Sequence, residues 1–195
     1  MGTLEAIAFV LGIVTIVLVV RRSVWNFPFG IVMVAVSAVV FFDARLYSDM
    51  LLQGFFLIAN AYGWRQWLRH AAHDGEVTVV AMPARDRLAW GIGVVAATLA
   101  WGLTMARLTD AAYPWIDAGI AMASIAAQVM MARRWIENWH LWIAIDIASV
   151  GLYAAKGLWL MAVLYVIFLA LAVWGLMDWR AAARRNRAGC GTVFA

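Results

Sequence analysis

The chain has 195 residues, of which 66% are apolar and 13% are charged, and its formal net charge is +4. A soluble domain is nearer half apolar and a quarter charged, so this composition excludes a soluble globular protein, and the excess apolar side chains must face lipid. The basic residues lie between apolar runs, which favours a membrane topology over nucleic-acid binding. A single cysteine, Cys190, excludes an internal disulfide.

Seven apolar runs predict seven transmembrane helices. A chain inside hydrocarbon satisfies its own backbone hydrogen bonds as a helix or in a closed barrel, and these runs are too long and too evenly apolar for barrel strands. A basic pair follows the first run, so we expect a retained span rather than a signal peptide. The runs cover residues 3–20, 25–42, 46–68, 87–106, 114–132, 139–155 and 158–179. We therefore expect an all-α integral membrane protein.

Polar and aromatic side chains mark the second and third runs. The second opens with Trp25 and Asn26, and Trp25 is either a pocket wall or an anchor at the membrane interface. The third carries Gln53 and Asn60, which are seven residues apart and share a helical face. Amides suit the recognition of hydroxyl groups or a carboxamide, and they serve equally as hydrogen-bonded joints between helices. Both interpretations stay open at this point.

One polar linker, residues 69–86, separates the third run from the fourth. His70 and His73 lie in it, three residues apart. They lack further ligands at useful spacing, so we expect a solvated loop and neither a metal site nor a cofactor.

The sixth run has the clearest polar pattern in the chain. Its polar and aromatic residues step by four, four, three and four, which places them on one face of a helix. These residues are Asn138, Trp142, Asp146, Ser149 and Tyr153. Polar side chains at membrane depth face the protein interior or water, so this stripe is expected to point inward. The alternative role for Asp146 is a hydrogen bond between helices.

Basic residues predict the orientation of the spans. One side of the membrane receives twelve of them: Arg21, Arg22, Arg65, Arg69, Arg85, Arg87, Arg133, Arg134, Arg180, Arg184, Arg185 and Arg187. The other side receives Arg45, Arg107 and Lys156. The positive-inside rule then puts the N-terminus outside and the C-terminus in the cytoplasm.

A single gapless shift, which we call the repeat shift, superposes the first three runs on the last three. The matches include polar, glycine and tryptophan positions: Arg21 with Arg133, Asn26 with Asn138, Ser37 with Ser149, Gly63 with Gly175 and Trp67 with Trp179. One further run lies between the two triplets, so both triplets enter the membrane from the same side. Parallel repeats of this kind build transporters whose solute site lies between the halves. The alternative is an old duplication that serves as scaffold.

An interior with tryptophans, tyrosines, amides and one acid suits a flat ring with a positive charge. The rings offer cation–π attraction, Asp146 a countercharge, and the amides orientation. The sequence has no GxSxG, HExxH or phosphate-loop motif, so we expect no enzyme activity.

Several strings resemble the PnuC family of vitamin transporters. They are WNFPFG at 25–30, LYSDMLLQGFFLIANAYGWRQW at 46–67, ENWHLW at 137–142 and LYVIFLALAVWG at 164–175. The resemblance implies a fold similar to full-length SWEET proteins, a homotrimer, and uptake of nicotinamide riboside by facilitated diffusion. It implies as solute contacts Trp25, Asn26, Gln53, Asn60, Trp64, Asn138, Trp142 and Tyr153, to which the stripe adds Asp146 and Ser149. Asp146 departs from some members, in which an amide is expected.

The apolar runs, the repeat and the resemblance together predict a domain organisation and a function. We expect a first three-helix repeat at 1–68, a cytoplasmic linker with the connecting helix at 69–112, a second repeat at 113–180, and a cytoplasmic polar tail at 181–195. The expected function is a facilitator of the bacterial inner membrane for nicotinamide riboside. The alternative is a facilitator for thiamine, another vitamin or a nucleoside on the same fold. A membrane-embedded enzyme using Asp146 and Asp49 is less favoured because the two acids lie near different depths and no metal-ligand set accompanies them. A structural subunit is less favoured because buried polar stripes are costly in a scaffold.

Overall fold

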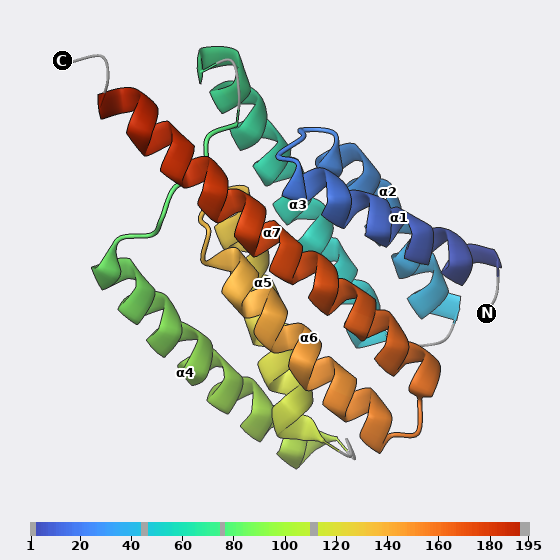
Figure 1. Ribbon diagram of the computed structural model, residues 1–195. Helices are drawn as coiled ribbons and strands as arrows, with labels where there is room; N and C mark the ends of the chain where they lie inside the picture. Colours follow the sequence, from blue (N-terminus) through green and yellow to red (C-terminus); the bar gives the residue numbers. More distant parts are fainter. Residues whose placement is uncertain (1–2, 44–46, 75–76, 110–112, 192–195) are drawn as a thin grey trace.

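The computed structural model describes residues 3–43, 47–74, 77–109 and 113–191, which form the seven helices of Figure 1. They are α1 (Thr3–Val20), α2 (Asn26–Asp43), α3 (Tyr47–Asp74), α4 (Ala84–Leu108), α5 (Pro114–Ala132), α6 (Asn138–Ala155) and α7 (Trp159–Gly191). The seven runs predicted from the sequence are confirmed as helices. The largest differences are at the ends of α3 and α7, which continue beyond the apolar runs through basic, helix-favouring residues.

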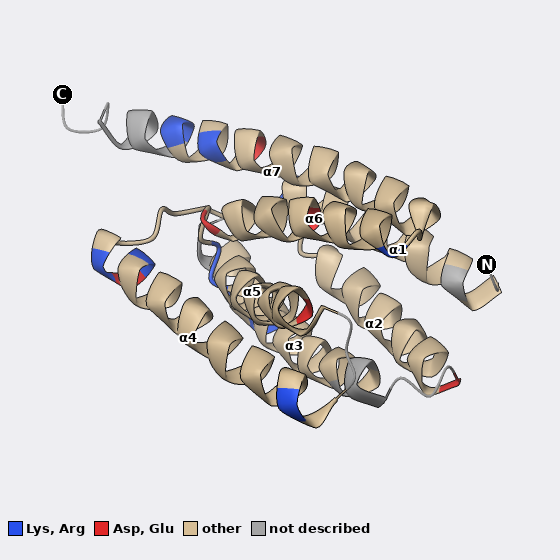
Figure 2. Cartoon of the chain, turned by 90° about the horizontal axis from the view of Figure 1, so that it is seen from below, with Lys and Arg blue, Asp and Glu red and all other residues tan. Residues whose placement is uncertain are grey.

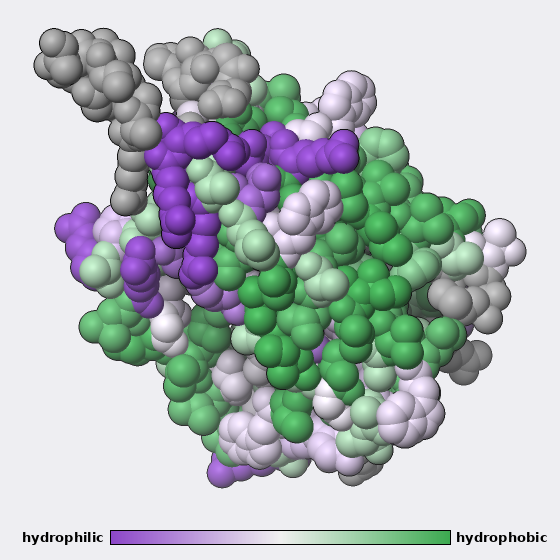
Figure 3. Space-filling view, in the orientation of Figure 1, coloured by the Kyte–Doolittle hydropathy of each residue, from purple (hydrophilic) through white to green (hydrophobic). Residues whose placement is uncertain are grey.

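The helices differ in how apolar they are. Within the described residues, α2, α4, α5 and residues 159–185 of α7 are each long and apolar enough to cross a membrane, and residues 6–20 form a shorter apolar helix. Helices α3 and α6 are outside this set, and they carry the amides and the acid noted above. Apolar side chains cover much of the face of the bundle shown in Figure 3. Leu88, Ile92 and Val95 of α4 are among the exposed apolar residues. This surface is suited to lipid.

The helices form two groups with one outlying helix. In the first group α2 packs against both α1 and α3, and in the second α6 packs against both α5 and α7. The groups meet where α3 contacts α5 and where α1 contacts α7. Helix α4 packs against α5 at the edge of the bundle (Figures 1 and 2). The group boundary therefore runs through the middle of the molecule.

Matching features recur in the two groups at the spacing of the repeat shift. Helices α2 and α6 begin at Asn26 and Asn138, and α3 and α7 begin at Tyr47 and Trp159. The turns before α2 and α6 each contain an arginine with positive φ, 55° at Arg22 and 62° at Arg134. The left-handed region is rare for residues other than glycine. Its occurrence at an arginine in both turns is therefore a feature that the two helix groups share.

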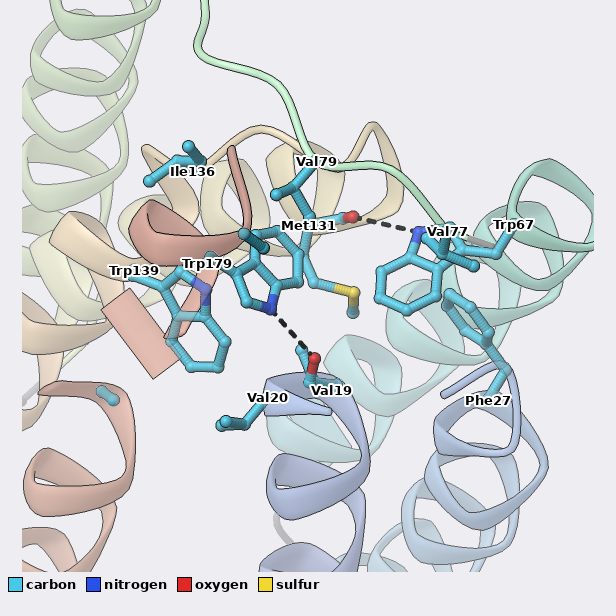
Figure 4. Packing of buried hydrophobic residues seen from close by; sticks show 12 residues of the cluster. Val19, Val20, Phe27, Trp67, Val77, Val79, Met131, Ile136, Trp139 and Trp179 are labelled. Carbon is cyan, nitrogen blue, oxygen red and sulfur yellow. Dashed lines mark hydrogen bonds between the residues drawn. The ribbon is translucent and has the colours of Figure 1, made fainter. Parts of the chain in front are cut away.

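Basic residues gather at one end of the bundle, which we call the arginine-rich end (Figure 2). It contains Arg21, Arg22, Arg85, Arg87, Arg133, Arg134 and Arg180. A hydrophobic cluster fills the bundle just beneath it, with side chains from six helices and the linker (Figure 4). Its aromatic members are Phe27, Trp67, Trp139 and Trp179.

Two indole groups join the helix groups inside this cluster. Trp67 Nε1 of α3 donates a hydrogen bond to the Met131 carbonyl of α5 at 3.3 Å, and Trp179 Nε1 of α7 donates to the Val19 carbonyl of α1 at 3.1 Å. The two rings lie 6.0 Å apart, centroid to centroid. The two bonds occupy matching positions, since the repeat shift relates Trp67 to Trp179 and Val19 to Met131.

We predict that Trp179→Phe lowers the stability of the folded chain by about 1–2 kcal/mol. The change removes one hydrogen bond, worth about 1 kcal/mol, and leaves unfilled volume in the cluster. Thermal unfolding in detergent measures the loss, with Trp174→Phe as the control because Trp174 of the same helix is 40% exposed. Equal melting temperatures in the two variants would contradict the assigned hydrogen bond.

The linker between α3 and α4 is not the solvated loop expected from its polarity. Val77, Val79 and Met82 are buried, and the first two join the hydrophobic cluster. Val80 forms a parallel β-bridge with Trp135 in the turn between α5 and α6. The expectation was wrong because alternate apolar residues of the linker cover the cluster while its backbone finds partners in the turn. His70 contacts Arg134, and the His73 side chain lies outside the described residues.

Candidate functional site

The polar stripe of α6 faces the protein interior. Asn138, Asp146 and Ser149 are at most 5% exposed, and Trp142 and Tyr153 are half-buried. Ile147, which points the other way on the same helix, is 57% exposed. The inward orientation predicted from the spacing is therefore confirmed. Its function as a solute site stays a prediction.

Asp146 lies beside an aromatic pair that joins α6 to α7. The rings of Tyr153 and Tyr165 stack with centroids 5.2 Å apart at 21°. The Tyr165 hydroxyl lies close to Tyr153 and to Asp146. Asp146 lies eight residues into α6, about 12 Å along its axis. Within the described residues no basic side chain forms an ion pair with Asp146.

Ser149 contributes a polar atom whose hydrogen bonding is incomplete. Its Oγ is buried and makes no hydrogen bond of ordinary geometry, although the Tyr165 hydroxyl is near enough to interact with it. A buried polar group without a partner costs about 1–3 kcal/mol, so such groups are retained where something else binds them. Asp146 and Ser149 thus form the part of the stripe that is best prepared for a polar ligand.

Sequence reasoning missed three residues near the stripe. Ser124 and Gln128 of α5 are buried, one helical turn apart, on a helix that packs against α6. Tyr165 of α7 is the third. The available signal was a small number of polar side chains within otherwise apolar runs. For Tyr165 there was a second signal, because the repeat shift places it on Gln53.

The amides of α3 are less clearly placed in the site. Asn60 is 5% exposed, and its Nδ2 donates to the Phe56 carbonyl at 2.8 Å. Its Oδ1 faces Gly30 of α2, where an added Cβ would approach to 2.9 Å. Of the two alternatives for Asn60, solute recognition and a joint between helices, this contact favours the joint between α3 and α2. Gln53 is half-buried, and Trp64 is 36% exposed.

Asn26 and Asn138 fix the turns from which α2 and α6 start. Asn26 Nδ2 donates to the Ser23 carbonyl at 2.7 Å, and Asn138 Nδ2 donates to the Trp135 carbonyl at 2.6 Å. Both Oδ1 atoms are buried and have no hydrogen-bond partner in the structure. Each asparagine therefore has a structural donor and an available acceptor.

The stripe of α6 lies in neither of two open grooves on the described part of the bundle. One of about 430 Å³ runs between α4 and α5 and is lined by apolar side chains that include Trp90 and Met122. Another of about 360 Å³ at the arginine-rich end is lined in part by Trp25, which is 68% exposed. Trp142 packs against the hydrophobic cluster. In this conformation the stripe is closed, and Trp25 lies apart from it on the outer surface.

Among the described residues, no group of three His, Cys, Asp or Glu side chains could hold a metal ion. The site instead offers a carboxyl group, hydroxyl groups, amides and stacked rings at membrane depth. That combination is chemically suited to a polar solute with an aromatic part.

A bundle of lipid-facing helices around a buried polar stripe with unused acceptors defines a membrane transporter of small solutes. Comparison with known proteins identifies the family of transporters. The chain belongs to the family described as the nicotinamide mononucleotide transporter, whose profile matches residues 2–181.

Individual relatives agree with this family. The chain is 30% identical to the nicotinamide riboside transporter PnuC of Escherichia coli (strain K12), over 94% of this chain and 87% of that protein. It is 32% identical to the riboflavin/roseoflavin transporter RibM of Streptomyces davaonensis, over 93% and 86%. It is similar to the crystal structure of the vitamin B3 transporter PnuC, with a TM-score of 0.76 and 27% identity over 93% of this chain and 82% of that one. The chain is thus a multi-pass membrane transporter and not an enzyme.

Proposed function

We propose that this chain carries nicotinamide riboside across the bacterial inner membrane and holds it beside the polar stripe of α6. The observation that carries the proposal is a buried pair at membrane depth: among the described residues, Asp146 has no ion pair and Ser149 has no hydrogen bond of ordinary geometry. The family supports the solute, since relatives that match most of this chain are named nicotinamide riboside transporters.

Nicotinamide riboside combines a flat cationic ring with a ribose, and each part has a counterpart in the site. The Asp146 carboxylate supplies a countercharge, and Trp142, Tyr153 and Tyr165 supply ring faces. Ser149 and the amides of Gln53, Asn60 and Asn138 supply partners for hydroxyls and the carboxamide. Trp25, Asn26 and Trp64 lie towards the surface or in a turn, and they contact the solute when the helices rearrange.

We further propose that the helices form a 3+1+3 parallel repeat like that of full-length SWEET proteins. The helix starts, left-handed arginines and indole hydrogen bonds that the repeat shift relates support it. The N-terminus is then outside, the C-terminus is cytoplasmic, and the arginine-rich end faces the cytoplasm. Assembly as a homotrimer is part of this proposal and rests on the family resemblance.

Movement of the solute is proposed to follow its gradient. Asp146 is the one acidic side chain that the structure describes at stripe depth, and this gives little basis for ion coupling. Proteoliposomes should equilibrate nicotinamide riboside without accumulating it. Accumulation of the unmodified solute against its gradient would contradict facilitated diffusion.

A side-by-side binding experiment tests the solute. We expect the purified chain to bind nicotinamide riboside more tightly than thiamine or riboflavin in calorimetry. Riboflavin is the alternative that a specific observation favours, because the RibM relative is 32% identical. Thiamine, also an aromatic cation, is the second alternative. Tighter binding of riboflavin or thiamine would make that vitamin the proposed solute in place of nicotinamide riboside. If the chain binds none of the three, the proposed solute is wrong.

A further inference from the structure

The two arginines with left-handed backbone, Arg22 and Arg134, lie at matching places in the two helix groups. Arg22 is in the turn between α1 and α2, and Arg134 is in the turn between α5 and α6. Any side chain with a Cβ is strained in this conformation, and glycine would relieve the strain. The backbone conformation closes the C-terminal caps of α1 and α5, where the Ser23 N–H bonds to the Leu18 carbonyl and the Trp135 N–H to the Met130 carbonyl. Glycine would serve these caps at lower cost, so what the arginine side chains contact bears on why arginine is present.

Each arginine reaches from its own group to the other. Arg22 Nη1 donates to Asp178 Oδ2 of α7 at 2.6 Å. Arg134 Nη2 lies 2.8 Å from His70 Nε2 of α3. The first contact thus joins α7 to the first group, and the second joins α3 to the second group.

The linker strengthens the second of these contacts. Arg134 Nη1 donates to the Thr78 carbonyl at 2.8 Å and to the Thr78 hydroxyl at 3.0 Å. The Met82 N–H donates to Glu137 Oε2 at 2.9 Å, and Arg87 of α4 pairs with Glu137 at 2.9 Å. These contacts hold the linker between α3 and α4 against the turn between α5 and α6.

These contacts lie where the two groups meet above the hydrophobic cluster. The indole bonds of Trp67 and Trp179 also cross the group boundary there. A solute released at this end must pass between the groups, because the flanks face lipid. The Arg22 and Asp178 side chains are 22% and 34% exposed, so water can replace their ion pair at small cost.

We infer that Arg22 and Arg134 are paired gating latches that hold the arginine-rich end of the solute path closed. Opening at this end requires Arg22 to leave Asp178 and Arg134 to leave His70 and the linker. The inference rests on the proposed transport function but not on which solute is carried.

Exposure of a buried reporter in the absence of solute tests the latches. In a Cys190→Ser background, Val20→Cys places one thiol in the cluster, where Val20 is 0% exposed. Arg22→Asp should raise the rate of maleimide labelling at position 20 about tenfold, the equivalent of about 1.4 kcal/mol. Arg134→Gln should act in the same direction.

Charge reversal separates a latch from a general structural function. Asp178→Arg alone should accelerate labelling, and the double variant Arg22→Asp/Asp178→Arg should return it to the starting rate. Arg85→Asp is the control, because the Arg85 side chain is 88% exposed and pairs with its neighbour Asp86. Unchanged labelling in the single variants, or a double variant as fast as the singles, would overturn the inference.

A second measurement covers variants that fold poorly. In the Cys190→Ser background, Arg22→Cys/Asp178→Cys crosslinked by a short bifunctional methanethiosulfonate reagent should stop equilibration of the solute in proteoliposomes, and a reductant that cleaves the crosslink should restore it. Transport at the same rate with the crosslink in place would also overturn the latch. Both tests differ from the binding panel, which can fail on the solute while the labelling results still support the latch.

Discussion

Asp146→Leu is expected to abolish useful solute binding while it makes the folded chain more stable. The carboxyl group is 5% exposed and has no ion-pair partner among the described residues, so its burial is costly in the absence of solute. Leucine fills a similar volume and should raise the unfolding free energy by about 1 kcal/mol, or the melting temperature by about 2–4 °C. Loss of a charged contact to the solute is worth about 1.5–3 kcal/mol, which is roughly 10- to 150-fold in Kd.

The opposite signs of these two effects make the prediction specific. A scaffold residue would lose stability and binding together, whereas a residue kept for its ligand gains stability when it is removed. Asp117→Asn is the matched control, since Asp117 is at the start of α5 and pairs with Lys156 at 3.6 Å. A less stable Asp146→Leu variant with unchanged affinity would show that Asp146 serves packing.

Gly175→Ala is expected to have the largest effect on folding. Gly175 of α7 lies against the Trp139 ring of α6, and an added Cβ would overlap that ring. Trp139 is 2% exposed and packs edge-on against Trp179, so it has no space into which to move. Overpacking of this kind costs about 1–3 kcal/mol, which lowers the melting temperature by about 2–4 °C for each kcal/mol.

Two further glycine variants provide a matching case and a control. Gly63→Ala should behave like Gly175→Ala, because its Cβ would meet the Phe27 ring in the corresponding contact between α3 and α2. Gly91→Ala on α4 is the control, since its Cβ would meet no atom within 4 Å, and alanine favours a helix by about 0.5–1 kcal/mol. If all three variants unfold at the same temperature, close helix approach at Gly63 and Gly175 does not stabilise the bundle.

Local patterns predicted the helices and the inward face of α6. Apolar runs set the spans, and a step of three or four residues decides which side chains share a helical face. Asp146 and Ser149 were found this way because both lie on one helix. The same reasoning could not bring Tyr165 of α7 to them, since contacts between helices depend on packing that no single run encodes.

The linker and the turn asparagines show a second limit. Residues 77–82 resemble a loop because polar residues surround them, yet Val77 and Val79 pack into an apolar cluster that exists only after six helices assemble. Asn26 and Asn138 were predicted as solute contacts, but the structure ties their Nδ2 atoms to their own turns. Sequence shows that an amide is present at these positions, and only the turn geometry shows which of its atoms is already bonded.

Protection of a thiol at the stripe tests whether the solute binds beside α6. Ser149→Cys in the Cys190→Ser background introduces one reactive group at a position that is 1% exposed on the inner face of α6. Saturating nicotinamide riboside should slow the reaction of that thiol with a small methanethiosulfonate reagent, and excess thiamine should protect it less. If the thiol reacts at the same rate with and without bound nicotinamide riboside, the solute does not pass beside the stripe.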